Sequence, residues 1–160
     1  MSKWKQGTYQ VKNLEKYVGK KMPTYRSSWE LMFCEFCDSH PSIIKWASEN
    51  VRIPYLNPVT GKATNYVPDF LIQYQDKNGQ QHTELIEIKP SKETTLENAR
   101  GTKDKIAVAV NTAKWAAAQA WCQQKGIRFK VINEDSIFHT NKKRVQKKRI
   151  AKSRIPKKKK

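Results

Sequence analysis

The sequence predicts an α/β fold in which helices pack on the faces of one mixed β-sheet. Apolar residues recur at helical spacing in two stretches, residues 27–39 and 103–124. Short segments rich in β-branched and aromatic residues lie between these stretches, and one more follows the second. The predicted order of elements is therefore α, β, β, β, β, α, β, which is typical of a mixed sheet flanked by helices.

The first predicted helix begins after Ser27 or Ser28, because either hydroxyl can cap its N-terminus, and it ends near Ser39, before Pro41. Its apolar side chains cover much of its circumference, so we expect this helix to be largely buried. These side chains are Trp29, Met32, Phe33, Phe36 and Cys37. Glu30 lies in the first turn, where a carboxylate favours the helix dipole. Helix geometry alone leaves open whether Glu30 also has a functional role.

Strands and turns are predicted between the two helices. Two short apolar segments, residues 43–46 and 51–55, precede a turn-rich loop at 57–61. A hairpin follows, in which strands 66–74 and 84–90 flank a turn.

The second helix and the last strand complete the predicted sheet. The helix follows a polar loop, is rich in alanine between Lys103 and Gln124, and has Gly126 as its C-cap. Residues 127–132 form the last strand, which exposes two basic side chains on one face.

The central hairpin brings charged residues together, provided that its strands pair in the right register. Glu87 and Lys89 point to the same face of their strand, about 6–7 Å apart along it. A two-residue loop at 78–79 would place Asp69 on the wrong face to meet Glu87. A three-residue loop ending at Gly79, in the left-handed conformation, sets Asp69 opposite Glu87. A bulge at the proline before Asp69 is a second route.

Two acids and a lysine on one sheet are costly to bury without a purpose, and a divalent cation would supply one. Carboxylate oxygens are the ligands that Mg²⁺ prefers, and a bound metal lowers the pKa of a water molecule. A nearby ammonium group stabilises the charge that develops on a phosphate. The pattern therefore favours a metal-dependent phosphodiesterase site. The alternative is that these are surface charges on an ordinary hairpin.

The positive charge of the chain, +18 in total, is concentrated at its two ends. Residues 1–25 hold six lysines against one acid, and residues 141–160 hold twelve Lys or Arg and no acid. Such arms suit a polyanion such as nucleic acid, although a lysine-rich terminus can also be only a solubility feature. We expect the tail, residues 139–160, to be disordered without DNA. The aromatic residues of the N-terminal arm either anchor it to the domain or stack on bases.

The three cysteines and the lack of a signal-peptide pattern indicate a reducing, intracellular compartment. Cys34, Cys37 and His40 have a spacing that zinc ligands can show, but they fall on one helix and would need a distant fourth ligand such as Cys122. We therefore expect core thiols and no structural zinc. No apolar run approaches the ~20 residues of a membrane span, so no membrane association is expected.

Four stretches of the chain, considered together, resemble a known family. They are Tyr25–Phe33 (YRSSWELMF), Ile53–Tyr55 (IPY), Tyr66–Phe70 (YVPDF) and Glu87–Pro90 (EIKP). This combination resembles the head completion nucleases of T-even-type tailed phages, which belong to the PD-(D/E)xK superfamily near the endonuclease subunit of heteromeric Tn-type transposases. The resemblance covers about residues 7–135 and implies a restriction-endonuclease-like αβββαβ core. Residues 26–138 would form this nuclease domain, between basic arms at 1–25 and 139–160.

The resemblance also implies roles for individual residues. Glu30, Asp69 and Glu87 would be catalytic acids and metal ligands, with the backbone carbonyl of Ile88 as a further ligand and Lys89 as the catalytic lysine. The metal would be Mg²⁺, for which Mn²⁺ could substitute. The residues expected to contact DNA, which are not part of the family motif, are Arg26, Lys114, Lys142, Lys143, Arg144, Lys147, Lys148 and Arg149.

The leading hypothesis is a Mg²⁺-dependent DNA endonuclease that acts in completion of the packaged phage head. Its expected partners are DNA and phage head or portal proteins, and its expected locations are the virion and the host cytoplasm during assembly. A second hypothesis is a DNA-binding plug of the virion without catalytic activity. A third is a repair or transposition nuclease of the same fold outside any virion.

Overall fold

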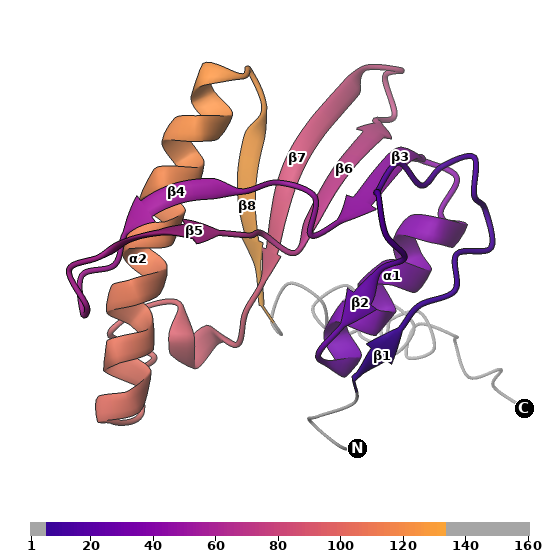
Figure 1. The fold of residues 1–160 in the computed structure, drawn as a ribbon. Helices are drawn as coiled ribbons and strands as arrows, with labels where there is room; N and C mark the ends of the chain where they lie inside the picture. Colours follow the sequence, from indigo (N-terminus) through magenta and orange to yellow (C-terminus); the bar gives the residue numbers. More distant parts are fainter. Residues whose placement is uncertain (1–5, 134–160) are drawn as a thin grey trace, which may run out of the picture.

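The computed structural model of the chain describes residues 6–133. Its elements follow the predicted αβββαβ order, with one hairpin inserted after the first core strand (Figure 1). The core elements are α1 (Ser28–Ser39), β3 (Ile43–Ser48), β6 (Phe70–Gln75), β7 (Gln81–Ile88), α2 (Thr102–Gln124) and β8 (Arg128–Ile132). Outside the described residues lies the predicted tail with its six expected DNA contacts, Lys142, Lys143, Arg144, Lys147, Lys148 and Arg149.

The central sheet has the strand order β3-β6-β7-β8 and is mixed, as the sequence predicts. The first two strand pairs are antiparallel and the pair β7–β8 is parallel. Helix α1 lies on the β3 side of the sheet and α2 on the β8 side (Figure 1). Neither helix in the described part of the chain is long and apolar enough to cross a membrane.

The hairpin formed by β6 and β7 has the register that brings the acids together. Phe70 lies opposite Ile86, and the pairing continues to the turn, where the N–H of Asp76 donates to the carbonyl of Gln80 at 2.8 Å. The loop between these two residues has three residues, and its last, Gly79, has φ = 79°. The predicted three-residue loop is therefore confirmed, and the same register places Asp69, the residue before β6, opposite Glu87 in β7.

The strand predicted over residues 66–74 is wrong in one respect, because it is two strands. β5 (Ala63–Tyr66) pairs with β4 (Ile53–Leu56) in a separate two-stranded sheet, and β6 begins only at Phe70. Pro68, fully buried between them, has no N–H to donate to a neighbouring strand. The chain therefore leaves the small sheet before this proline and enters the central sheet after it.

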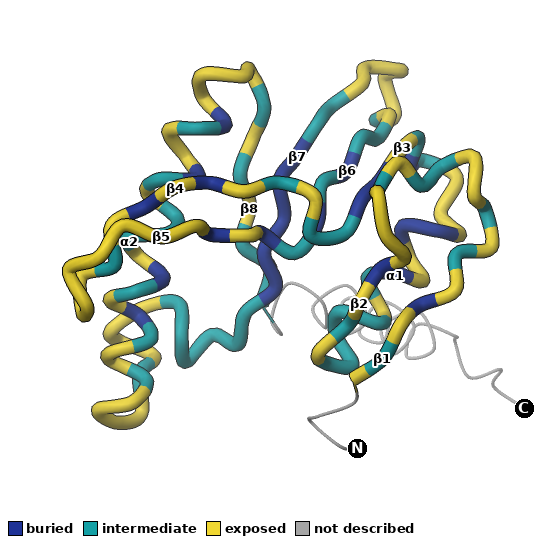
Figure 2. The backbone as a smooth tube through the Cα atoms, viewed as in Figure 1, coloured by how far each residue is buried: buried dark blue, intermediate teal, exposed yellow. Residues whose placement is uncertain are grey.

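Helix α1 is less buried than its composition predicts. It has the predicted N-cap, Ser27, but Met32 and Phe36 are 46% and 42% exposed. The helix packs through one face only, which carries the fully buried Cys34 and Cys37 (Figure 2). The expectation of a largely buried helix is wrong because a helix that packs on one face of a sheet leaves its outer side to solvent.

The N-terminal segment packs against the core from residue 6 onward. Its strands β1 (Gly7–Thr8) and β2 (Thr24–Tyr25) pair with each other, and the ring of Tyr17 meets that of Trp46 edge-on at 4.8 Å. Its aromatic residues thus anchor the segment, the first of the two explanations offered for them.

Asp38, at the end of α1, is the polar anchor of this segment. Its buried carboxylate accepts hydrogen bonds from the Tyr9 hydroxyl at 2.7 Å and from the N–H groups of Lys12 and Asn13 at 2.8 and 3.0 Å. Burial opposes the ionisation of Asp38, but these hydrogen bonds outweigh it and lower the pKa of the carboxyl group. Its stabilising effect is therefore present above its ordinary pKa of about 4 and is lost as pH falls through the lowered pKa.

Replacing Asp38 tests this anchor. Asp38→Ala should lower the free energy of unfolding by about 3 kcal/mol in urea denaturation, because three donors lose a buried acceptor. Glu35→Ala, on the exposed face of the same helix, should change it by less than about 0.5 kcal/mol. Equal stability of the two variants would show that Asp38 does not hold the segment.

Candidate active site

The predicted acidic pair lies where β6 begins and β7 ends. One carboxylate oxygen of Asp69 accepts a hydrogen bond from the N–H of Ile88 at 2.8 Å. The N–H of Asp69 donates to Oε2 of Glu87 at 3.3 Å. Each acid is thus fixed by the backbone of the other's strand, and the structure brings together the two side chains that the sequence predicts to converge.

Burial sets the electrostatics of this pair. Glu87 is 4% exposed and lies in the buried second half of β7 (Figure 2). Burial first, and then repulsion from Glu87 and Glu30, raise the pKa of Asp69 well above its usual range. Burial also raises the pKa of Glu87, although Lys89 and Tyr66 oppose this effect. Two neighbouring acids with raised pKa values favour either a shared proton or a nearby cation.

Lys89 supplies one positive charge beside the pair. Its Nζ lies 3.7 Å from Oε1 of Glu87, on the side of the strand where the alternation of side chains predicts it. Its backbone N–H donates to the carbonyl of Ile132, so the end of β7 is fixed by β8. The ammonium group is therefore positioned by the sheet and still partly open to solvent.

Glu30 forms hydrogen bonds with the residues at the start of α1. Its N–H donates to the hydroxyl of Ser27 at 3.2 Å, and its Oε2 accepts a hydrogen bond from the N–H of Arg26 at 2.7 Å. This arrangement resembles a capping box, in which an acid in the first turn reaches back to the backbone before the helix. Glu30 still lies close enough to raise the pKa of Asp69, and burial raises its own pKa.

The predicted set of three metal-binding acids is not assembled as a set. Among residues 6–133, no three His, Cys, Asp or Glu side chains converge closely enough to hold a metal ion. The physical reason is that Glu30 is drawn to the N–H of Arg26 at the helix start, while Asp69 and Glu87 bond to each other's strands. The donors themselves suit a hard cation, because all are carboxylate oxygens, with Glu87 buried and Asp69 half-buried.

Comparison with known proteins decides the family. Residues 40–134 match the family model described as the TnsA-like endonuclease N-terminal region. The chain belongs to the TnsA-like endonuclease family. It is also similar to the head completion nuclease of Enterobacteria phage T4, with 39% identity over 142 residues that cover 82% of this chain and 92% of that protein. The predicted resemblance is confirmed, and this homology supports a nuclease function.

The matched region of the TnsA-like family contains Asp69, Glu87 and Lys89 but begins after Arg26 and Glu30. The αβββαβ order and the mixed sheet agree with the predicted restriction-endonuclease-like core. The family match thus includes the acidic pair and its lysine, whereas the helix that carries Glu30 lies before it.

Lys114 approaches the acidic pair from α2, on the side opposite α1. Its Nζ lies over the rings of Tyr66 and Tyr55, 5.5 and 5.9 Å from their centroids. Burial first, and then repulsion from Lys89, lower the pKa of Lys114. It therefore lies near the site, as the sequence predicts, while its contact with phosphate stays a prediction.

Arg26 and Glu49 form an ion pair that sequence reasoning missed. Nη1 of Arg26 bonds to Oε1 of Glu49, the residue after β3. The N–H of Glu49 donates to the carbonyl of Asp69 at 2.9 Å, which places Glu49 beside the acidic pair. The sequence holds no local signal for this, because the placement depends on the pairing of β3 with β6.

The cysteines are core residues, as expected. Cys34 and Cys37 lie in the apolar cluster beneath α1, and Cys122 lies in the separate cluster beneath α2. Burial raises the pKa of Cys34 to about 12, so this thiol stays protonated. His40 is exposed and bonds to Ser42 through its Nδ1.

Neutralising one acid of the pair tests how much the pair lowers the stability of the fold. Asp69→Asn should raise the free energy of unfolding of the protein in EDTA by about 1–2 kcal/mol near pH 8, because an amide does not repel Glu87. The pKa of Asp69 is raised in the fold, so the stability of the wild type falls as pH rises from the ordinary pKa of this group through the raised pKa, and the gain in Asp69→Asn should shrink towards about pH 5.

Urea denaturation of both proteins at the two pH values measures this difference. Asp76→Asn is the control, because Asp76 lies at the exposed turn of the same two strands and its pKa is lowered, chiefly by His82. This control should give no gain in stability. A loss of stability in Asp69→Asn at both pH values would contradict the account.

Proposed function

We propose that this chain is a metal-dependent DNA endonuclease that hydrolyses phosphodiester bonds. The observation that carries the proposal is the pair of the half-buried Asp69 and the buried Glu87, with the Lys89 ammonium 3.7 Å from Glu87. Carboxylates buried side by side are costly, and function explains why they are kept. The family match and the phage relative support the same reaction class.

The residues present fit a divalent cation, for which we propose Mg²⁺, with Mn²⁺ as a possible substitute. Asp69 and Glu87 would hold it, with the carbonyl of Ile88 and, if its carboxylate leaves the N–H of Arg26, Glu30. A cation bound there supplies a Lewis acid for the scissile phosphate. The Lys89 ammonium would stabilise negative charge on the phosphate or orient the attacking water.

DNA binding would draw on the positive charge of the chain, +18 in total. Within the described residues, Arg26 and Lys114 lie on opposite sides of the acidic pair, one before α1 and one on α2. We propose that each contacts a phosphate on its side. The basic residues of the tail would add salt-dependent affinity without sequence preference.

The proposed setting is the completion of the packaged phage head, with head or portal proteins as partners and the virion and host cytoplasm as locations. The name of the T4 relative supports this setting. A DNA-binding plug without catalysis is the alternative, which the unassembled set of acids in the described residues favours. A repair or transposition nuclease is a third possibility, favoured by the TnsA-like family match.

Plasmid nicking with Mg²⁺ and with EDTA separates enzyme from plug. Asp69→Asn and Lys89→Ala should each lower the rate of Mg²⁺-dependent nicking by about 100-fold or more, because the first removes a charged ligand of the cation and the second removes the ammonium group beside the reacting phosphate. Lys77→Ala, in the exposed β6–β7 turn, removes the same charge far from the site and should nick normally. Wild-type rates in the two site variants would reject the assignment, and DNA binding by the wild type without nicking would establish the plug.

A further inference from the structure

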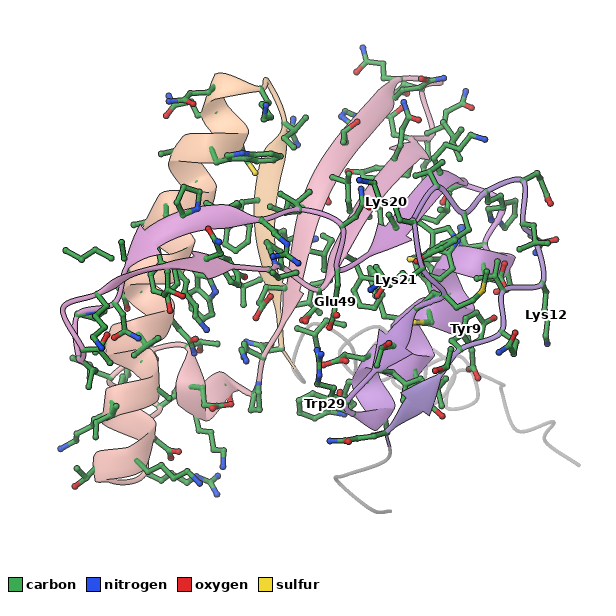
Figure 3. All side chains as sticks on the ribbon, viewed as in Figure 1. Tyr9, Lys12, Lys20, Lys21, Trp29 and Glu49 are labelled. Atoms are coloured by element: carbon green, nitrogen blue, oxygen red, sulfur yellow. The ribbon has the colours of Figure 1, made fainter. Side chains whose placement is uncertain are left out.

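We infer that Glu49 is a positioning residue of this site, whose carboxylate holds the guanidinium group of Arg26 beside the acidic pair and directs it to a phosphate of the DNA backbone. The inference rests on the proposed function and assigns a residue that neither the sequence motifs nor the family roles include. In Figure 3, Glu49 lies in the middle of the view, between α2 on one side and α1 on the other.

The backbone of Glu49 has an unusual conformation, which is the first support for this role. Its φ is 47°, and it is the one non-glycine residue with positive φ between residues 6 and 133. This left-handed conformation is unfavourable for a residue with a Cβ, and glycine or asparagine adopts it more easily. A long acidic side chain at such a position indicates that the side chain contributes something that glycine cannot.

The position of Glu49 in the sheet is the second argument. Ser48 lies opposite Phe70, so the next residues along the two strands are Glu49 and Asp69, joined by the hydrogen bond from N–H to carbonyl. Asp69 in turn bonds to Glu87 on β7. Three acids therefore follow one another at the ends of three adjacent strands, and the first of them is paired with an arginine.

The geometry of Arg26 is the third argument. Its backbone N–H bonds to Glu30 and its Nη1 to Glu49, so it is fixed at both ends. A guanidinium group has five N–H donors, and its side chain here is 59% exposed. Donors outside the ion pair can therefore bind an anion, and a planar guanidinium binds phosphate with two parallel hydrogen bonds.

A simpler explanation makes the opposite prediction. If Glu49 acted only through its charge, it would repel the DNA backbone, and its removal would strengthen DNA binding. If Glu49 positions Arg26, its removal should weaken binding and cleavage although the protein becomes less negative. The sign of the change therefore decides between the two.

Glu49→Gly is the main variant, because glycine removes the carboxylate and suits the positive φ. It should be at least as stable as the wild type in urea, lower kcat/KM for Mg²⁺-dependent nicking by about tenfold, and weaken DNA binding in EDTA about threefold. Arg26→Ala should have effects of the same sign and at least the same size. Glu49→Gln keeps an acceptor for the guanidinium and should lie between Glu49→Gly and the wild type.

The double variant Glu49→Gly with Arg26→Ala should be no worse than Arg26→Ala alone, because Glu49 acts through Arg26. Glu35→Ala is the matched control, since it removes one exposed acid from α1 and should not weaken binding. Tighter DNA binding by Glu49→Gly would overturn the inference. So would a double variant whose loss of activity equals the product of the losses in the two single variants. A wild type that binds DNA without cleaving it would reject the proposed function, while the affinity changes in EDTA would still test Glu49.

Discussion

The structure depends on one costly interaction, the close approach of two carboxylates, one buried and one half-buried, where two adjacent strands meet. Asp69 and Glu87 are each fixed by the other's backbone, and burial together with mutual repulsion raises the pKa of Asp69. Such a pair lowers the stability of the fold unless a proton or a cation neutralises it. The proposed chemistry on a phosphodiester would explain why such a pair is kept at the expense of stability.

The surrounding elements bring further charges to this pair from both sides. Helix α1 begins next to it with Glu30 and Arg26, while α2 presents Lys114 over two tyrosine rings. Asp38 fastens the N-terminal segment to the end of α1 and so stabilises the helix that carries Glu30. Basic side chains thus lie beside the acids, as the proposed binding of a polyanion requires.

Much of the fold, and the pairing of Asp69 with Glu87, could be predicted from the sequence because local signals were consistent with the fold. Ser27 begins α1 and Gly126 follows α2, and the three-residue turn ending at Gly79 sets the register that places Asp69 opposite Glu87. The break in the predicted strand at Pro68 could have been predicted from its missing N–H, but the residues on both sides have the composition of one continuous strand. Glu49 and the Asp38 anchor depend on contacts between segments far apart in the sequence, which local patterns do not encode. The exposure of α1 likewise depends on which part of the sheet the helix covers.

The central claim is that Asp69 and Glu87 form a cation site, and calorimetric titration of the protein with Mn²⁺ tests it most directly. The account predicts saturable binding by the wild type that releases protons near neutral pH, because the pKa values of both acids are raised before the cation binds. It predicts that this binding is lost in Asp69→Asn while the variant stays folded. Undiminished binding of Mn²⁺ by Asp69→Asn, or no binding by the wild type, would contradict it.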